Sequence, residues 1–230
     1  MTVGLFLRTV ATVSICVEAN ALHGQSVQLA YNGMSTPSAG YSSADPSTVY
    51  GALLSVTKTG TLGSVGLSLY NGSASGGSIV AGTMQLSIYD ASQGTPLGGA
   101  HLPLLASVSI PLNFSASPLL AGSYALLTTG DLSSQKISLT PKVLVTQRFE
   151  LTQGSATRFG IAALRTAPTE GFSTGHYFVS NSQNAPGFYS GADGLKAFPL
   201  YQMTVVPEPE SCAVAVGLVL VGWSLWRRSR

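Results

Sequence analysis

The sequence predicts an all-β protein, with the main part of the chain folded as a single-domain antiparallel β-sandwich. Three observations lead to this prediction. Apolar and polar residues alternate with a period of two in several short stretches, turn-like segments separate these stretches, and no stretch between the two ends keeps a helical period of apolar residues. Many short strands punctuated in this way favour a sandwich, which we prefer to a barrel.

The alternation is clearest in residues 65–69, 84–88 and 108–114, where every second residue is apolar. A strand with this pattern presents one row of side chains to the core and the other to solvent. Pro111 interrupts the third stretch and has no backbone N–H to donate. We therefore expect its strand to lie at a sheet edge or to contain a bulge.

Further strand candidates are short apolar stretches bounded by turn residues. They are Tyr124–Thr128, residues 136–139, residues 143–151, residues 156–164, Tyr177–Ser180 and residues 198–205. Gly, Pro, Asn, Asp and Ser are typical of turns, so we expect loops at residues 71–77, 90–99, 130–134, 166–175 and 181–194.

The first 21 residues are expected to form a secretory signal peptide. Arg8 supplies its positive charge, and residues 9–17 supply a short apolar stretch. Ala19 and Ala21 fit the small-x-small rule before a cleavage site. The prediction is therefore that the mature chain begins after Ala21.

The last 26 residues combine three features in a fixed order. These are an acidic proline motif (Val206, Pro207, Glu208, Pro209), an uncharged apolar run from Cys212 to Trp226, and a basic end (Arg227, Arg228, Arg230). As a helix the run would span roughly 22 Å, which is short of a ~30 Å hydrocarbon core unless the arginine side chains extend to the interface. Trp223 and Trp226 favour that interface, and the arginines would hold this end in the cytoplasm.

This tail resembles the PEP-CTERM sorting signal of proteins exported by Gram-negative bacteria. In that family an exosortase, a membrane-embedded cysteine peptidase, recognises the tail, cuts near the motif and releases or transfers the rest of the protein. The resemblance implies export through the inner membrane, a transient membrane anchor, and a final place in the cell envelope, on the outer surface or in the extracellular matrix. It divides the chain into a signal peptide (residues 1–21), an exported β-sandwich domain (22–204) and a sorting signal (205–230).

A second resemblance covers residues 48–128. The strand candidates at residues 62–70 and 84–90, the Pro/Gly turn at residues 94–98 and the apolar stretch at residues 119–126 are similar to a group of β-sandwich modules. Bacteria fuse these modules, the choice-of-anchor domains, to alternative surface anchors. The resemblance implies a surface module and carries over no catalytic residue.

Cysteine usage and charge exclude several classes of function. Cys16 lies in the expected signal peptide and Cys212 in the apolar run, so the body has no disulfide, no thiolate nucleophile and no cysteine metal site. Residues 22–206 contain seven Lys or Arg and six Asp or Glu, without a basic patch. We therefore expect no nucleic-acid partner.

No motif in the body indicates catalysis. His23, His101 and His176 lack metal-ligand spacing, and a zinc site built from scattered residues is the alternative. The six carboxylates of the body are widely spaced along the chain: Asp45, Asp90, Asp131, Glu150, Glu170 and Asp193. Asx turns explain the aspartates that precede turn-like segments, and a loop calcium site is the alternative. We expect no catalytic residue, no metal, no cofactor and no enzyme activity.

An aromatic group near the end of the body is the best candidate for a binding surface, since sugar rings stack on such side chains. The alternative is that Phe178 and Phe198 lie in the core and that the tyrosines simply occupy sheet positions. The group consists of Tyr177, Phe178, Phe188, Tyr189, Phe198 and Tyr201.

Three functions follow from these observations. The first is an exported, non-enzymatic cell-surface or matrix protein that an exosortase-type peptidase processes through its tail. The second is a carbohydrate-binding module for exopolysaccharide. The third is a secreted hydrolase, which requires two carboxylates, or a serine and a histidine, to converge in one pocket.

Overall fold

The computed structural model describes residues 27–58, 60–74, 76–94, 102–180, 186–189 and 195–207. The expected signal peptide, with Ala19 and Ala21, lies outside the described residues. The same holds for Glu208 and Pro209 of the proline motif, for the apolar run with Cys212, Trp223 and Trp226, and for Arg227, Arg228 and Arg230.

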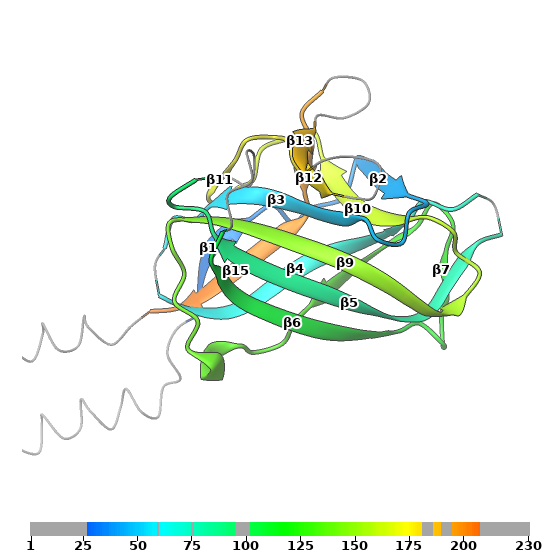
Figure 1. Cartoon of the computed structure of the whole chain (residues 1–230), viewed down its shortest axis with the longest axis horizontal. Coiled ribbons are helices and arrows are strands. Elements are labelled where there is room, and N and C mark those ends of the chain that lie inside the picture. Colours follow the sequence, from blue (N-terminus) through cyan, green and yellow to red (C-terminus); the bar gives the residue numbers. More distant parts are fainter. Residues whose placement is uncertain are drawn as a thin grey trace, which may run out of the picture. The chain divides into compact units, whose positions relative to one another are not determined.

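The described chain is all-β and forms two antiparallel sheets (Figure 1), consistent with a β-sandwich. The first sheet has the order β1 (Gln28–Asn32), β15 (Tyr201–Val206), β4 (Thr61–Asn71), β10 (Phe159–Leu164) and β14 (Phe198–Pro199), with β2 (Ala39–Ser43) on β10 and β8 (Tyr124–Thr128) on β4. The second has the order β13 (Gly187–Tyr189), β12 (Tyr177–Ser180), β3 (Val49–Ser55), β9 (Lys142–Gly154), β5 (Ser78–Asp90) and β6 (Leu104–Asn113), with β11 (Phe172–Ser173) on β3 and β7 (Leu119–Leu120) on β5.

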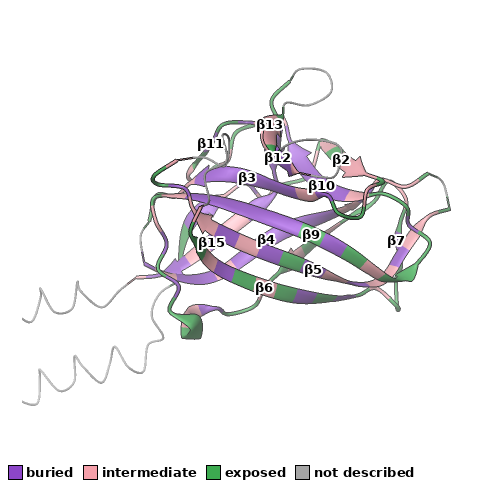
Figure 2. Cartoon of the chain, viewed as in Figure 1, coloured by how far each residue is buried: buried purple, intermediate pink, exposed green. Residues whose placement is uncertain are grey.

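The main core lies between the sheets and draws on both. Leu67 and Leu69 of β4 and Leu86 and Ile88 of β5 belong to one cluster of fully buried side chains. On β5 and β6 buried residues alternate with half-buried or exposed ones along the strand, whereas β3 and the first half of β9 are buried almost throughout (Figure 2). The alternating strands therefore cover the core with one face, and the central strands pack on both faces.

The structure confirms most of the predicted strands. Residues 65–69, 84–88 and 108–113 lie in β4, β5 and β6, and the bounds of β8 and β12 agree with the prediction. The expectation for Pro111 is confirmed as well, because β6 is an edge strand that pairs with β5.

Other predictions were wrong. Residues 136–139 were predicted as a strand but make only an isolated bridge, from Ser138 to Thr61. They follow a 3-10 turn (η1, Ser133–Gln135), which ends at Lys136 because that residue takes a left-handed conformation (φ 51°). Strands β1, β2 and β3 were not predicted, and the short strands β11 and β13 lie in segments expected to be loops.

Two glycines allow β2 to lie close to its neighbours in the first sheet. Gly160 of β10 pairs with Ser42, and a Cβ atom at Gly160 would overlap the carbonyl oxygen of Tyr41. A Cβ atom at Gly40 would lie 2.5 Å from the Tyr70 ring. A side chain at either position would therefore push β2 away from β10 and β4.

We predict that Gly160→Ala lowers the free energy of unfolding by about 1–3 kcal/mol, because the added methyl group meets backbone that cannot rotate away. Urea denaturation of the purified protein measures this. Gly94→Ala is the matched control, since nothing lies within 4 Å of a Cβ atom there. A Gly160 variant as stable as the Gly94 variant would contradict the packing described for β2.

Candidate functional site

A groove of about 350 Å³ lies where β2 of the first sheet faces β3 and β12 of the second. These strands and β13 gather in one region of the protein (Figure 1). The groove is lined by Gly40, Tyr41, Ser42, Ser43, Tyr50, Arg158, Tyr177 and Val179.

Strand register decides which side chains reach the groove. Tyr177 pairs with Tyr189 across β12 and β13, and Val179 pairs with Tyr50 across β12 and β3. Because successive residues of a strand point to opposite faces, Tyr177 and Val179 share one face and Phe178 takes the other. The groove face of the second sheet therefore carries tyrosines from three strands.

The tyrosine rings form a row that crosses from one sheet to the other. The rings of Tyr41 and Tyr177 are stacked, with centroids 4.4 Å apart and an interplanar angle of 24°. Tyr189 continues the row, with its centroid 6.3 Å from that of Tyr177 and 38% of its surface exposed. This arrangement gives the groove an aromatic wall that is partly open to solvent.

The phenol groups of Tyr50 and Tyr177 stay neutral at physiological pH, because the pKa of each is raised. Burial raises the pKa of Tyr177 above its ordinary value of 10.0, and the neighbouring Tyr41 and Tyr189 raise it further. Burial also raises the pKa of Tyr50, with a smaller contribution from Tyr177 that is partly opposed by Arg158. The tyrosines therefore offer uncharged hydroxyl groups and ring faces.

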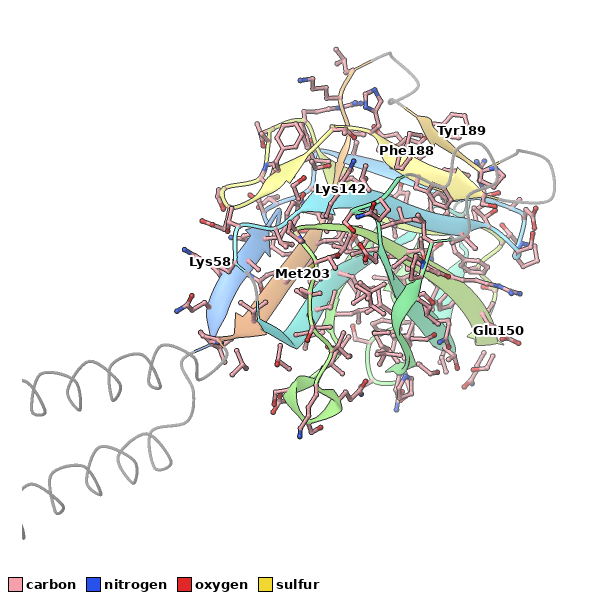
Figure 3. All side chains as sticks on the ribbon, turned by 60° about the vertical axis from the view of Figure 1, so that its left-hand side comes forward. Lys58, Lys142, Glu150, Phe188, Tyr189 and Met203 are labelled. Atoms are coloured by element: carbon pink, nitrogen blue, oxygen red, sulfur yellow. The ribbon has the colours of Figure 1, made fainter. Side chains whose placement is uncertain are left out.

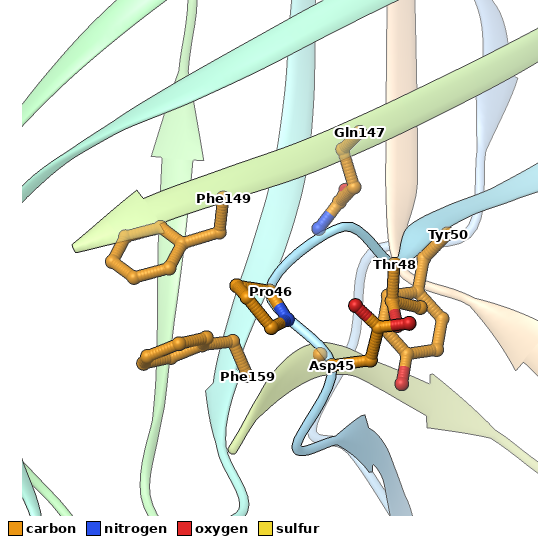
Figure 4. A pocket seen from close by; sticks show the side chains of 8 residues that line it. Asp45, Pro46, Thr48, Tyr50, Gln147, Phe149 and Phe159 are labelled. Carbon is orange, nitrogen blue, oxygen red and sulfur yellow. The ribbon is translucent and has the colours of Figure 1, made fainter. Parts of the chain in front are cut away.

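A smaller cavity (Figure 4) shares its lining residue Tyr50 with the groove. It measures about 10 Å³, which is room for one water molecule. The Thr48 hydroxyl oxygen and Gln147 Oε1 are buried at this cavity without a hydrogen-bond partner in the part of the chain that the structure describes. A single buried water molecule is the group that usually satisfies such a pair.

Gln147 also connects the two sheets through the core. Its Nε2 atom donates a hydrogen bond of 2.7 Å to the carbonyl oxygen of Ser68 on β4. The Ser68 hydroxyl in turn donates to the Ala162 carbonyl oxygen (3.2 Å) and accepts from the Ala162 amide (3.0 Å) on β10. Ala162 pairs with Gly40 of β2, so the network reaches the strand that carries Tyr41.

The aromatic residues predicted from the sequence separate into three places. Tyr177 lines the groove, and Tyr189 lies beside it, in ring contact with Tyr177. Phe178 and Phe188 meet edge to face on the opposite face of their strands (centroids 5.6 Å apart, interplanar angle 63°), and Phe178 packs there with Leu53 and Leu144. Phe198 and Tyr201 are buried in the core.

Sequence reasoning missed Tyr41, Tyr50 and Arg158. Tyr41 lies in a short, polar strand with too little alternation to predict, and Tyr50 lies in a strand that is apolar on both faces. Arg158 directly precedes β10, and only the pairing of β2 with β10 brings it to the groove. An aromatic residue followed by two serines, Tyr41-Ser42-Ser43, is the one weak local signal.

The carboxylates lie on separate elements. Asp45, Asp90 and Asp131 accept hydrogen bonds from the amides of Ser47, Ser92 and Ser133, which confirms the expected Asx turns at Asp90 and Asp131. These hydrogen bonds hold the pKa values of Asp90 and Asp131 below the ordinary value.

Glu150 lies in the second half of β9, away from Phe188 and Tyr189 (Figure 3), and Glu170 accepts a hydrogen bond from Thr57. Asp193, His23 and His101 lie outside the described residues. Within the described ranges there is no group of three or more His, Cys, Asp or Glu side chains that could hold a metal ion.

Two residues of the expected sorting motif are described. Val206 is the last residue of β15, and Pro207 follows it directly. Among the segments that the structure describes, no helix has the length and apolar character needed to cross a membrane.

We predict that Gln147→Leu lowers the free energy of unfolding by about 1–3 kcal/mol, because the buried Ser68 carbonyl oxygen loses its donor from the second sheet. Gln85→Leu is the matched control, since Gln85 is exposed on the neighbouring strand β5, and its expected cost is about 0.5 kcal/mol or less. Chemical denaturation of both variants measures the difference. Equal stability of the two would show that the Gln147 contact is dispensable.

Comparisons of the chain with protein-family models, with curated proteins and with solved structures found no match.

Proposed function

We propose that this protein is an exported, non-enzymatic cell-surface or matrix protein of a Gram-negative bacterium, flanked by a signal peptide and a C-terminal transmembrane helix. In this proposal an exosortase-type peptidase of the inner membrane cuts the PEP-CTERM-like tail and frees the β-rich body from its transient anchor. The observation that carries the proposal is that the last strand of the body ends at Val206, the first residue of the proline motif.

The packing of β15 limits where such a cut can fall. β15 lies between β1 and β4, and its residues Tyr201, Met203 and Val205 are fully buried. A cut within the strand would remove core side chains, and the burial of each stabilises the folded protein by about 1.5–3 kcal/mol. A cut at or after Val206 leaves the strand complete.

We predict that the mature protein begins after Ala21 and ends between Val206 and Cys212. Intact-mass measurement of protein recovered from a host with the cognate peptidase tests both ends. The control is a chain that lacks residues 207–230, which should accumulate in a different place. A mature chain that keeps Arg230 in that host, or unchanged localisation of the shortened chain, would rule out processing through the tail.

Carbohydrate binding is a second candidate function, and the tyrosine row in the groove favours it. The C–H groups of a sugar ring carry partial positive charge, which the negative face of an aromatic ring attracts. The groove also offers the hydroxyl group of Ser43, which shares a face of β2 with Tyr41, as a hydrogen-bonding partner, and its volume falls in the range typical of small-molecule sites. The ligand in this proposal is an exopolysaccharide at the cell surface.

We predict that Tyr189→Ala weakens glycan binding about 3- to 10-fold, because a ring of the wall is lost. Tyr124→Ala is the matched control, since Tyr124 is also about 40% exposed but lies on β8 of the other sheet. A glycan array followed by titration of the best ligand measures both variants. Equal losses, or no binding by the unaltered protein, would remove this candidate.

A further inference from the structure

Arg158 gives the groove a positive charge that sugar stacking alone does not require. It is the charged residue among those lining the groove. Its backbone amide donates to the Ser73 hydroxyl (3.1 Å), and its guanidinium Nη2 donates to the carbonyl oxygen of Ser42 (3.2 Å). The side chain is therefore held against β2, beside Tyr41, although it is exposed.

The guanidinium group keeps most of its hydrogen-bonding capacity. Arginine has five N–H donors in a planar fork, and the bond to Ser42 uses one of them. Among the described residues, no carboxylate forms an ion pair with Arg158. A fork of this kind matches the two oxygen atoms of a carboxylate, sulfate or phosphate group and binds them more strongly than it binds a hydroxyl group.

The other groups in the groove suit an anion. The phenols of Tyr50 and Tyr177 keep their protons, so they bring no negative charge. The residues that line the groove include no carboxylate, and the Asp45 carboxylate lines the smaller cavity, where Oδ1 accepts hydrogen bonds from the amide (2.8 Å) and the hydroxyl (2.6 Å) of Ser47.

We propose that the groove binds a saccharide that carries an oxyanion, with a sugar ring against the tyrosine row and the oxyanion on the Arg158 guanidinium. This inference rests on the carbohydrate-binding candidate and names its ligand class, which is an acidic polysaccharide. The oxyanion is a uronate carboxylate or an ester sulfate or phosphate on the sugar. These groups share the geometry that the fork recognises.

The test is calorimetric titration of the full chain in non-ionic detergent with matched pairs of oligosaccharides. The acidic probes are oligomers of galacturonate, mannuronate and guluronate, each paired with its carboxyl-reduced neutral form, and a sulfated oligosaccharide paired with its desulfated form. We expect at least one acidic probe to bind 10-fold or more tightly than its neutral partner, and added salt to weaken that binding.

Two variants test whether the preference for the acidic probe over the neutral one arises in the groove. Arg158→Gln should reduce the affinity for the acidic probe about 10-fold and leave the neutral partner within 2-fold. Arg148→Gln, which removes an exposed arginine on β9, is the charge-matched control and should change neither affinity beyond 2-fold. Circular dichroism of both variants shows that the fold is retained.

The outcomes separate this inference from the function on which it rests. Equal binding of acidic and neutral forms, lost in Tyr189→Ala, would keep carbohydrate binding and overturn the preference for an oxyanion. Equal losses in Arg158→Gln and Arg148→Gln would show general charge attraction and would also overturn it. Binding of free sulfate without any saccharide would overturn the sugar contact, and binding of no probe would overturn both proposals.

Discussion

The hydrogen bond from Gln147 to the Ser68 carbonyl oxygen is the contact on which the arrangement of the groove depends. It crosses the core between β9 and β4, and both residues are almost completely buried. Strands β4 and β10 pair through their backbones at only two positions, Asn71 with Phe159 and Tyr70 with Gly160. Beyond them the Ser68 hydroxyl takes the place of backbone pairing, because it hydrogen-bonds to both the amide and the carbonyl oxygen of Ala162. A buried polar link of this kind is costly to break from either side, because the remaining partner is left unsatisfied.

This link joins the two walls of the groove. On the second sheet Gln147 pairs with Tyr50, and on the first sheet the network reaches Ala162, which pairs with Gly40 next to Tyr41. The rings of Tyr41 and Tyr177, one from each sheet, then stack on each other at the groove. A wall built from paired strands loses little conformational entropy when a ligand binds, which favours affinity. The proposed ligand therefore meets a preformed surface with one fixed cation.

The sequence predicted the fold class and the strands with clear alternation, such as residues 84–88, because one face of those strands meets the core and the other meets solvent. It did not predict β3, whose residues are buried on both faces, or β2, which depends on pairing with β10 more than 115 residues away. For the site, Tyr177 and Tyr189 were identified from the grouping of aromatic residues near the end of the body. Arg158 and Tyr41 were not, since their proximity is a product of tertiary pairing that no local pattern encodes.

If the Gln147–Ser68–Ala162 network holds the two walls of the groove together, they move as one unit. Hydrogen exchange at the Ala162 amide tests this most directly, since that amide donates to the Ser68 side chain. We expect Ala162 to exchange as slowly as the amides of β5 and β9, through global unfolding only. Fast exchange at Ala162 while β5 and β9 remain protected would show that β10 and β2 open independently of the second sheet, so that the network does not hold the walls together.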